Sequence, residues 1–176
     1  MSLVIRRIAI ENFRKFRDPF TIDNLTDGLN IIIEPNETGK PTLMEALRAA
    51  FFVRHNTQNQ LAKSYAPRGD SVAPRVEIDF LIDGAKWSLR KRFLKSASID
   101  VEGPQGRAQG DEAEALLNTL LGSVRDTSRA GDVSTYGALG LLWGAQMDAR
   151  GVRAPGAIVR DRITASIAAG VGAIRG

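Results

Sequence analysis

Gly39 and Lys40 are the residues of this sequence best placed to do chemistry. They follow the apolar run 31–33 and the polar segment 34–38, and they precede a segment with helical periodicity. A loop of the pattern G-x-x-x-x-G-K-[S/T] between a strand and a helix binds polyphosphate, because its backbone N–H groups surround the phosphates, its lysine contacts them and its hydroxyl binds magnesium. The Gly-Lys pair and its position therefore indicate a phosphate-binding loop.

Two residues depart from that pattern. Glu34 stands where the first glycine belongs, and it adds a negative charge near a polyphosphate. Pro41 stands where the serine or threonine belongs; it removes the magnesium ligand and one N–H donor, and it disfavours the helical conformation at Lys40. Thr42 does not simply replace that hydroxyl, because the next residue on a helix points about 100° away. We expect weak nucleotide binding, and no hydrolysis by this chain alone.

The segments around the loop have clear strand and helix patterns. Residues 3–10 and 20–22 predict strands, and Ile31-Ile32-Ile33 predicts a strand buried on both faces. After Pro41, which suits a first helical turn, apolar residues recur at the α-helical period. This predicted apolar stripe consists of Leu43, Met44, Leu47, Ala50 and Phe51.

An antiparallel hairpin is predicted further along. Asp83-Gly84 is a favoured two-residue turn, so Ile82 should pair with Ala85. The same register pairs Phe80 with Trp87 and Ile78 with Leu89 on one face, and Glu77 with Arg90 on the other. Residues 98–102 predict a third strand.

The remaining segments give weaker patterns. Residues 55–74 predict irregular structure, with His55, the single histidine, on the surface. Asp111 and Glu114 resemble a capping box that opens a helix ending at Gly122. Residues 123–140 predict a loop, 141–143 a buried segment and 158–171 a helix.

Several of these segments together resemble the SMC-like and RecF-like ATPase heads, which include the ATPases of DNA double-strand-break repair. The resemblance rests on Asn12-Phe13-Arg14, on Gly28-Leu29-Asn30-Ile31-Ile32, and on Pro35 to Lys40 followed by Thr42-Leu43-Met44-Glu45-Ala46; Leu141 to Gln146 resembles the family's Q-loop. It implies an α/β fold: the N-terminal lobe of a P-loop NTPase spanning residues 1–176. Its mixed sheet would carry the P-loop helix and an antiparallel hairpin layer, with a P-loop region at 28–52, the hairpin at 75–94 and a Q-loop region at 141–148.

The resemblance also implies ATP and magnesium as cofactors. The nucleotide-binding residues would be Asn36, Glu37, Thr38, Gly39, Lys40, Thr42 and Arg14. Lys40 would hold phosphate, Thr42 would reach the α-phosphate, Arg14 would lie near the nucleotide, and Gln146 would act as the catalytic residue that senses magnesium and the attacking water. The implied partners are a C-terminal ATPase lobe, a second head and DNA.

Composition restricts these possibilities only mildly. A net charge of +4 slightly favours anionic partners, and Lys91, Arg92 and Lys95 either contact DNA or serve cross-strand pairing and solvation. No apolar run reaches the length of a membrane span, and the absence of cysteine suits a cytoplasmic protein. Three alternatives stay open: a nonhydrolysing interaction module, a decayed or truncated copy, and a phosphotransferase, for which no catalytic base is evident.

Overall fold

A computed structural model describes residues 2–31 and 39–122. The chain divides into two compact units, Met1–Leu117 and Asn118–Gly176. All described strands and most described helical residues belong to the first unit. The predicted loop at 123–140, the buried segment and Q-loop region at 141–148 and the helix at 158–171 lie outside the described residues.

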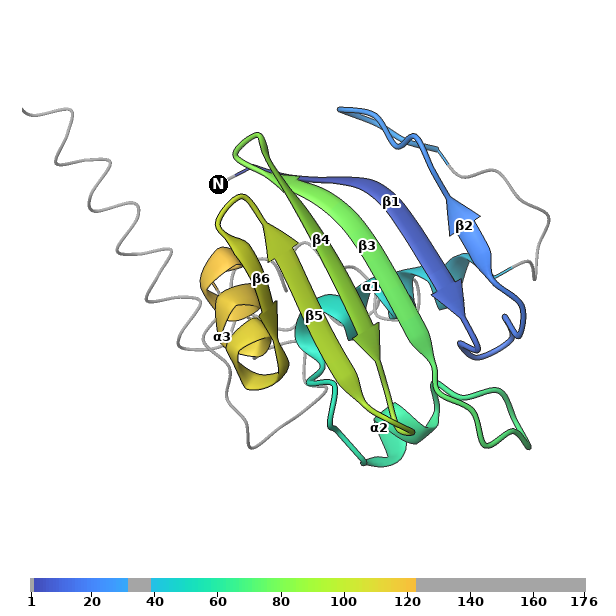
Figure 1. The fold of residues 1–176 in the computed structure, drawn as a ribbon. Coiled ribbons are helices and arrows are strands. Elements are labelled where there is room, and N and C mark those ends of the chain that lie inside the picture. The colour runs from blue at the N-terminus through green and yellow to red at the C-terminus, as the bar shows by residue number, and fades with distance from the viewer. Residues whose placement is uncertain (1, 32–38, 123–176) are drawn as a thin grey trace, which may run out of the picture. The chain divides into compact units, whose positions relative to one another are not determined.

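The described residues form a six-stranded sheet of order β2-β1-β3-β4-β5-β6, in which every neighbouring pair is antiparallel (Figure 1). The strands are β1 (Leu3–Glu11), β2 (Phe20–Ile22), β3 (Arg75–Ile82), β4 (Ala85–Arg92), β5 (Ser98–Gly103) and β6 (Gly106–Gln109). The predicted strands at 3–10, 20–22 and 98–102 are confirmed. Strand β6 was not predicted, because four residues with two small side chains give no clear alternation.

The hairpin β3–β4 has the predicted register at each pair named above. Asp83 and Gly84 both have positive φ, 48° and 84°, as a tight two-residue turn requires. Because the register is fixed, Phe80 and Trp87 share one face of the sheet, and Glu77 and Arg90 share the other.

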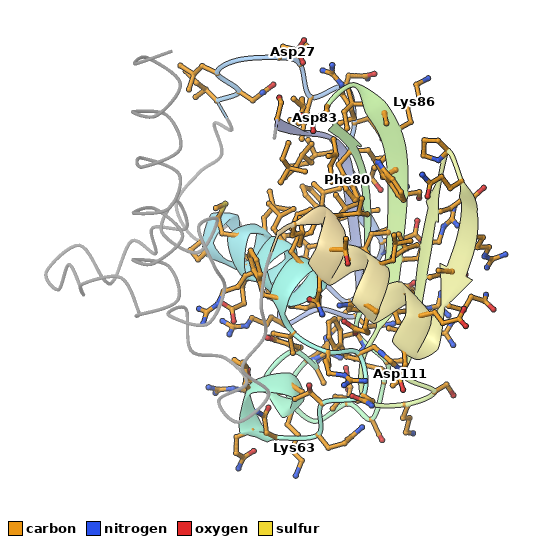
Figure 2. All side chains as sticks on the ribbon, turned by 90° about the vertical axis from the view of Figure 1, so that its left-hand side faces the viewer. Asp27, Lys63, Phe80, Asp83, Lys86 and Asp111 are labelled. Atoms are coloured by element: carbon orange, nitrogen blue, oxygen red, sulfur yellow. The ribbon has the colours of Figure 1, made fainter. Side chains whose placement is uncertain are left out.

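The two faces of the sheet differ in chemistry. On the inner face, Ile8, Ile78 and Leu89 are fully buried, and the Phe80 ring meets the Phe51 ring edge-on at 5.5 Å between centroids. Figure 2 shows Phe80 between the sheet and the helices. The outer face carries cross-strand ion pairs: Arg7 with Asp79, Arg75 with Glu11, Arg90 with Glu102 and Arg107 with Asp100. One face is therefore the core and the other is solvated.

Helix α1 (Lys40–Phe52) lies across the inner face and contacts β1, β3 and β4 (Figure 1). Pro41 lies in its first turn, as predicted. Four members of the predicted stripe are buried, but Met44 is exposed. Ala46 and Ala49 are fully buried, and they bring the helix backbone close to the sheet. The buried face of α1 therefore includes Ala46 and Ala49 and leaves out Met44, which the predicted stripe had included.

Two further helices follow. Helix α2 (Gln60–Lys63) is short, and the Asn59 side chain caps it by accepting a hydrogen bond from the Ala62 N–H. It lies inside the segment predicted to be irregular. Helix α3 (Gly110–Leu120) begins directly after β6, so Asp111 is already in its first turn and is not the N-cap. The capping-box prediction was therefore wrong, whereas Gly122, with φ of 60°, ends the helix as predicted.

The segment before the predicted phosphate loop differs from its own prediction. Ile31 is not part of a strand and is 71% exposed, so the prediction of a buried strand was wrong for this residue. Ile32 and Ile33 lie outside the described residues. The α/β class is confirmed, but the parallel pairs that would make the sheet mixed are not among the described strands.

Candidate functional site

The start of α1 is an uncapped helix terminus. Gly39 is the N-cap residue, with φ of 111° and ψ of 13°, and its carbonyl accepts a hydrogen bond of 2.9 Å from the Leu43 N–H. Among the residues that the structure describes, no side chain caps this end, and the first turn holds no acidic residue. The first N–H groups of a helix have no partner within the helix, and the helix dipole favours negative charge there. This end of α1 is therefore suited to an anion.

The turn between β1 and β2 packs directly on Gly39. A Cβ atom at Gly39 would lie 2.5 Å from the Phe16 ring and 2.6 Å from Cε of Lys15. Only glycine fits this contact, and its positive φ is also unfavourable for other residues. The loop pattern singled out Gly39 for phosphate binding. The close contact with Phe16 and the positive φ give a second, structural reason for glycine at this position.

The turn itself is fixed at Phe13 and Arg14. Phe13 and Phe16 exchange backbone hydrogen bonds of 2.8 and 3.0 Å, and the fully buried Phe13 ring stacks on Tyr65 at 4.9 Å between centroids. Arg14 has φ of 52°, and its N–H donates to the Tyr65 carbonyl at 2.5 Å. The backbone of Arg14 is therefore held from two directions.

The side chain of Arg14 reaches α1. Its Nη2 lies 3.5 Å from Oε1 of Glu45, while its Nε is buried and has no hydrogen-bond partner within residues 2–31 and 39–122. Thr42, one helical turn before Glu45, is almost buried. The structure thus places Gly39 and Thr42 at the beginning of α1, and it places the Arg14 side chain against Glu45 of the same helix.

The other predicted site residues are described only in part or not at all. Lys40 is the first residue of α1, so Pro41 did not prevent the helix from starting there. Asn36, Glu37, Thr38 and Gln146, together with Glu34, lie outside the described residues. Within residues 2–31 and 39–122, no group of three or more His, Asp or Glu side chains is arranged to hold a metal ion. None of the helices in those ranges is both long and apolar enough to cross a membrane.

A buried polar cluster of Lys91, Glu114 and His55 was missed by the sequence analysis. Lys91 Nζ donates to the Val53 carbonyl at 2.9 Å, and it lies 3.4 Å from Oε1 of Glu114. The same oxygen accepts the His55 N–H at 2.9 Å and lies 3.0 Å from His55 Nδ1. The cluster therefore joins β4, α3 and the segment that follows α1.

Two predictions are corrected by this cluster. His55 is buried, so its predicted surface position was wrong, and buried Lys91 cannot contact DNA. The hairpin register held a signal for Lys91, because it places this residue on the inner face, two positions after Leu89. No comparable signal exists for His55, whose partner is 59 positions away.

Comparisons with known proteins match most of this chain. A family model described as an AAA domain matches residues 7–130. The chain is 29% identical over 140 residues to a protein of Methanopyrus kandleri named DNA double-strand break repair Rad50 ATPase. The match covers 72% of this chain but 15% of that relative, so the chain spans about one seventh of the relative's length.

Proposed function

The chain belongs to the AAA domain family, and from this premise we propose that it is the nucleotide-binding N-terminal lobe of a Rad50-like DNA-repair ATPase head. One observation carries the proposal: the start of α1, at Gly39, packs against the turn that holds Arg14, and no side chain among the described residues caps it. A helix terminus of this kind, preceded by a loop with a Gly-Lys pair, is suited to bind phosphate groups.

ATP fits the described half of this site. The first turn of α1 offers backbone donors and holds no acidic residue, and the partly exposed guanidinium group of Arg14 offers further donors. When bound, ATP would supply the phosphoanhydride bond whose hydrolysis drives heads of this type. Gly39, Lys40, Thr42 and Arg14 would hold it, together with Asn36, Glu37 and Thr38.

The proposed nucleotide site is less suited to magnesium than to ATP. Pro41 has neither the hydroxyl that would bind the ion nor an N–H for the phosphate. A hydrogen bond to a charged group contributes about 1.5–3 kcal/mol, so its loss weakens nucleotide binding by tenfold or more. We therefore propose weak binding with little dependence on magnesium, with Gln146 unable to support hydrolysis in this chain alone.

A titration with a fluorescent ATP analogue tests this function. We expect weak, saturable binding that changes little when EDTA replaces magnesium, and that is lost in Lys40→Ala. The matched control is Lys63→Ala, on α2, which should bind like the unaltered chain. Low-micromolar binding that requires magnesium would contradict the impaired site, and binding unchanged in Lys40→Ala would contradict the site itself.

The rest of the head is the proposed protein partner. Leu29 and Ile31, which flank the phosphate loop on its N-terminal side, are 85% and 71% exposed. The two apolar side chains are two positions apart and both face solvent among the described residues. We propose that a C-terminal ATPase lobe covers them, and that a second head and DNA join the assembled ATPase. Arg92 and Lys95 are proposed DNA contacts of that assembly.

A nonhydrolysing interaction module is the second candidate, favoured by Pro41. Size-exclusion chromatography of this chain with a separately produced C-terminal lobe distinguishes it from a decayed copy. Co-elution supports either the ATPase lobe or the module, and the ATP titration then separates those two. A chain that neither associates nor binds nucleotide would be a decayed copy.

A further inference from the structure

The backbone of Arg14 is fixed by several contacts. The direction of its side chain is not fixed by them. Its positive φ, its hydrogen bond to the Tyr65 carbonyl and the stacking of the adjacent Phe13 on Tyr65 all fix the position of its Cα. A guanidinium group on a fixed Cα can still point in several directions, because the side chain has several rotatable bonds. A second contact is needed to choose among them.

Glu45 provides that contact from the first half of α1. Its Oε1 lies 3.5 Å from Nη2 of Arg14, and the two side chains are 18% and 39% exposed. The contact engages one end of the guanidinium group and leaves Nε buried, with no hydrogen-bond partner in the described part of the chain. A buried N–H without an acceptor is unfavourable, so a native protein that keeps one usually has a role for it.

We propose that Glu45 is a positioning residue, which holds the Arg14 guanidinium so that its remaining N–H groups face a nucleotide phosphate at the start of α1. This inference rests on the proposed function. Guanidinium groups bind phosphate oxygens with planar, directed hydrogen bonds, so their orientation determines how well they bind. Glu45 itself does not contact the nucleotide.

Electrostatics alone predicts the opposite effect for Glu45. A carboxylate near a polyphosphate repels it, so removing the charge should strengthen nucleotide binding if Glu45 acts only through its charge. A purely structural ion pair at this exposure would contribute little to stability and nothing to nucleotide affinity. Weaker binding after the loss of a negative charge is therefore specific to positioning.

The experiment is a double-mutant cycle with a fluorescent ATP analogue. Arg14→Ala, Glu45→Gln and the double variant are compared in the unaltered chain and in a Glu34→Gly/Pro41→Ser background, where binding is expected to be stronger. We expect Arg14→Ala to weaken binding by roughly tenfold, as for a lost hydrogen bond to a charged group. Glu45→Gln should weaken it by about three- to tenfold, and the double variant should bind no more weakly than Arg14→Ala.

Two controls accompany the cycle. Glu112→Gln removes an exposed carboxylate from the first turn of α3 and should leave affinity unchanged. The thermal midpoint of Glu45→Gln should stay close to that of the unaltered chain, because a partly exposed ion pair contributes little.

The possible outcomes separate this inference from the proposed function. The positioning role is overturned, and the proposed function stands, if the Glu45→Gln variant binds nucleotide as tightly as the unaltered chain or more tightly. The same conclusion follows if Glu45→Gln weakens nucleotide binding by the same factor in the Arg14→Ala background as in its absence. If neither background binds nucleotide, both are overturned.

Discussion

Lys91 and Glu114 form an ion pair of 3.4 Å inside the protein, with 0% and 4% of their side chains exposed. The pair joins the inner face of β4 to α3, and Lys91 also donates to the Val53 carbonyl at the end of α1. A cation near the last carbonyl groups of a helix is favoured by the helix dipole. The contact therefore links the C-terminal end of α1 to α3, the helix that follows the sheet.

Removing one member of this pair should be strongly destabilising. In Glu114→Ala the ammonium group of Lys91 stays buried without its carboxylate, and breaking a buried ion pair in this way costs about 3–5 kcal/mol. Urea unfolding measures this cost. Asp111→Ala, which breaks the exposed pair with Arg54, serves as the control and should cost less than about 1 kcal/mol. An equal loss of unfolding free energy in the two variants would mean that the ammonium group of Lys91 is not buried in solution.

Substitution of Gly39 should disturb the turn as well as the helix. Gly39→Ala brings a methyl group into the Phe16 ring and imposes a positive φ on alanine, which alone costs about 1–2 kcal/mol. Gly84→Ala is a matched control, since Gly84 has φ of 84° and no atom within 4 Å of its Cβ position. We expect Gly39→Ala to lower the free energy of unfolding more than Gly84→Ala does. A smaller loss at Gly39 would show that the contact with Phe16 yields easily.

The ion pair between Arg107 and Asp100 predicts a pH dependence. Hydrogen bonds from Arg107 and, less strongly, from Gln109 outweigh partial burial and lower the pKa of Asp100 below its usual value. The folded pKa is lower than the unfolded pKa of about 3.9, so the stabilisation is fully present above pH 4 and is lost as the pH falls through the folded pKa.

Arg107→Ala tests that dependence. The variant should raise the pKa of Asp100 towards its usual value, as measured by an NMR titration of the carboxyl carbon. Its free energy of unfolding should also fall less steeply than that of the unaltered chain as the medium is acidified below pH 4. An unchanged titration midpoint would mean that the pair does not persist in solution. Lys86→Ala, on β4 and therefore separated from β6 by β5, controls for the general loss of positive charge.

Local signals predicted most of the described fold. Asp83 and Gly84 determined a turn type, and the turn determined every pair of the β3–β4 hairpin. Pro41 and the apolar stripe located α1, although the stripe wrongly included Met44, which is exposed, and left out Ala46, which is buried. Short elements such as α2 and β6 offered too few residues for a period to be recognised.

Contacts between distant residues could not be predicted in the same way. His55 is buried because Glu114, far along the chain, accepts its ring and backbone N–H groups, and no spacing in the sequence reports this. At the candidate site, the Gly-Lys pair identified the start of α1. The arrangement of Arg14 and Glu45 depended on the turn at Phe13 packing against Tyr65.

The proposed function requires a polyphosphate site at the start of α1 that Glu34 and Pro41 weaken. The most direct test compares the affinity of the chain for a fluorescent ATP analogue with that of Glu34→Gly/Pro41→Ser. Restoring both positions should strengthen binding by roughly a hundredfold, equivalent to about 3 kcal/mol, and should make it depend on magnesium. Equal affinity in the two proteins, or no binding by the restored variant, would contradict the claim.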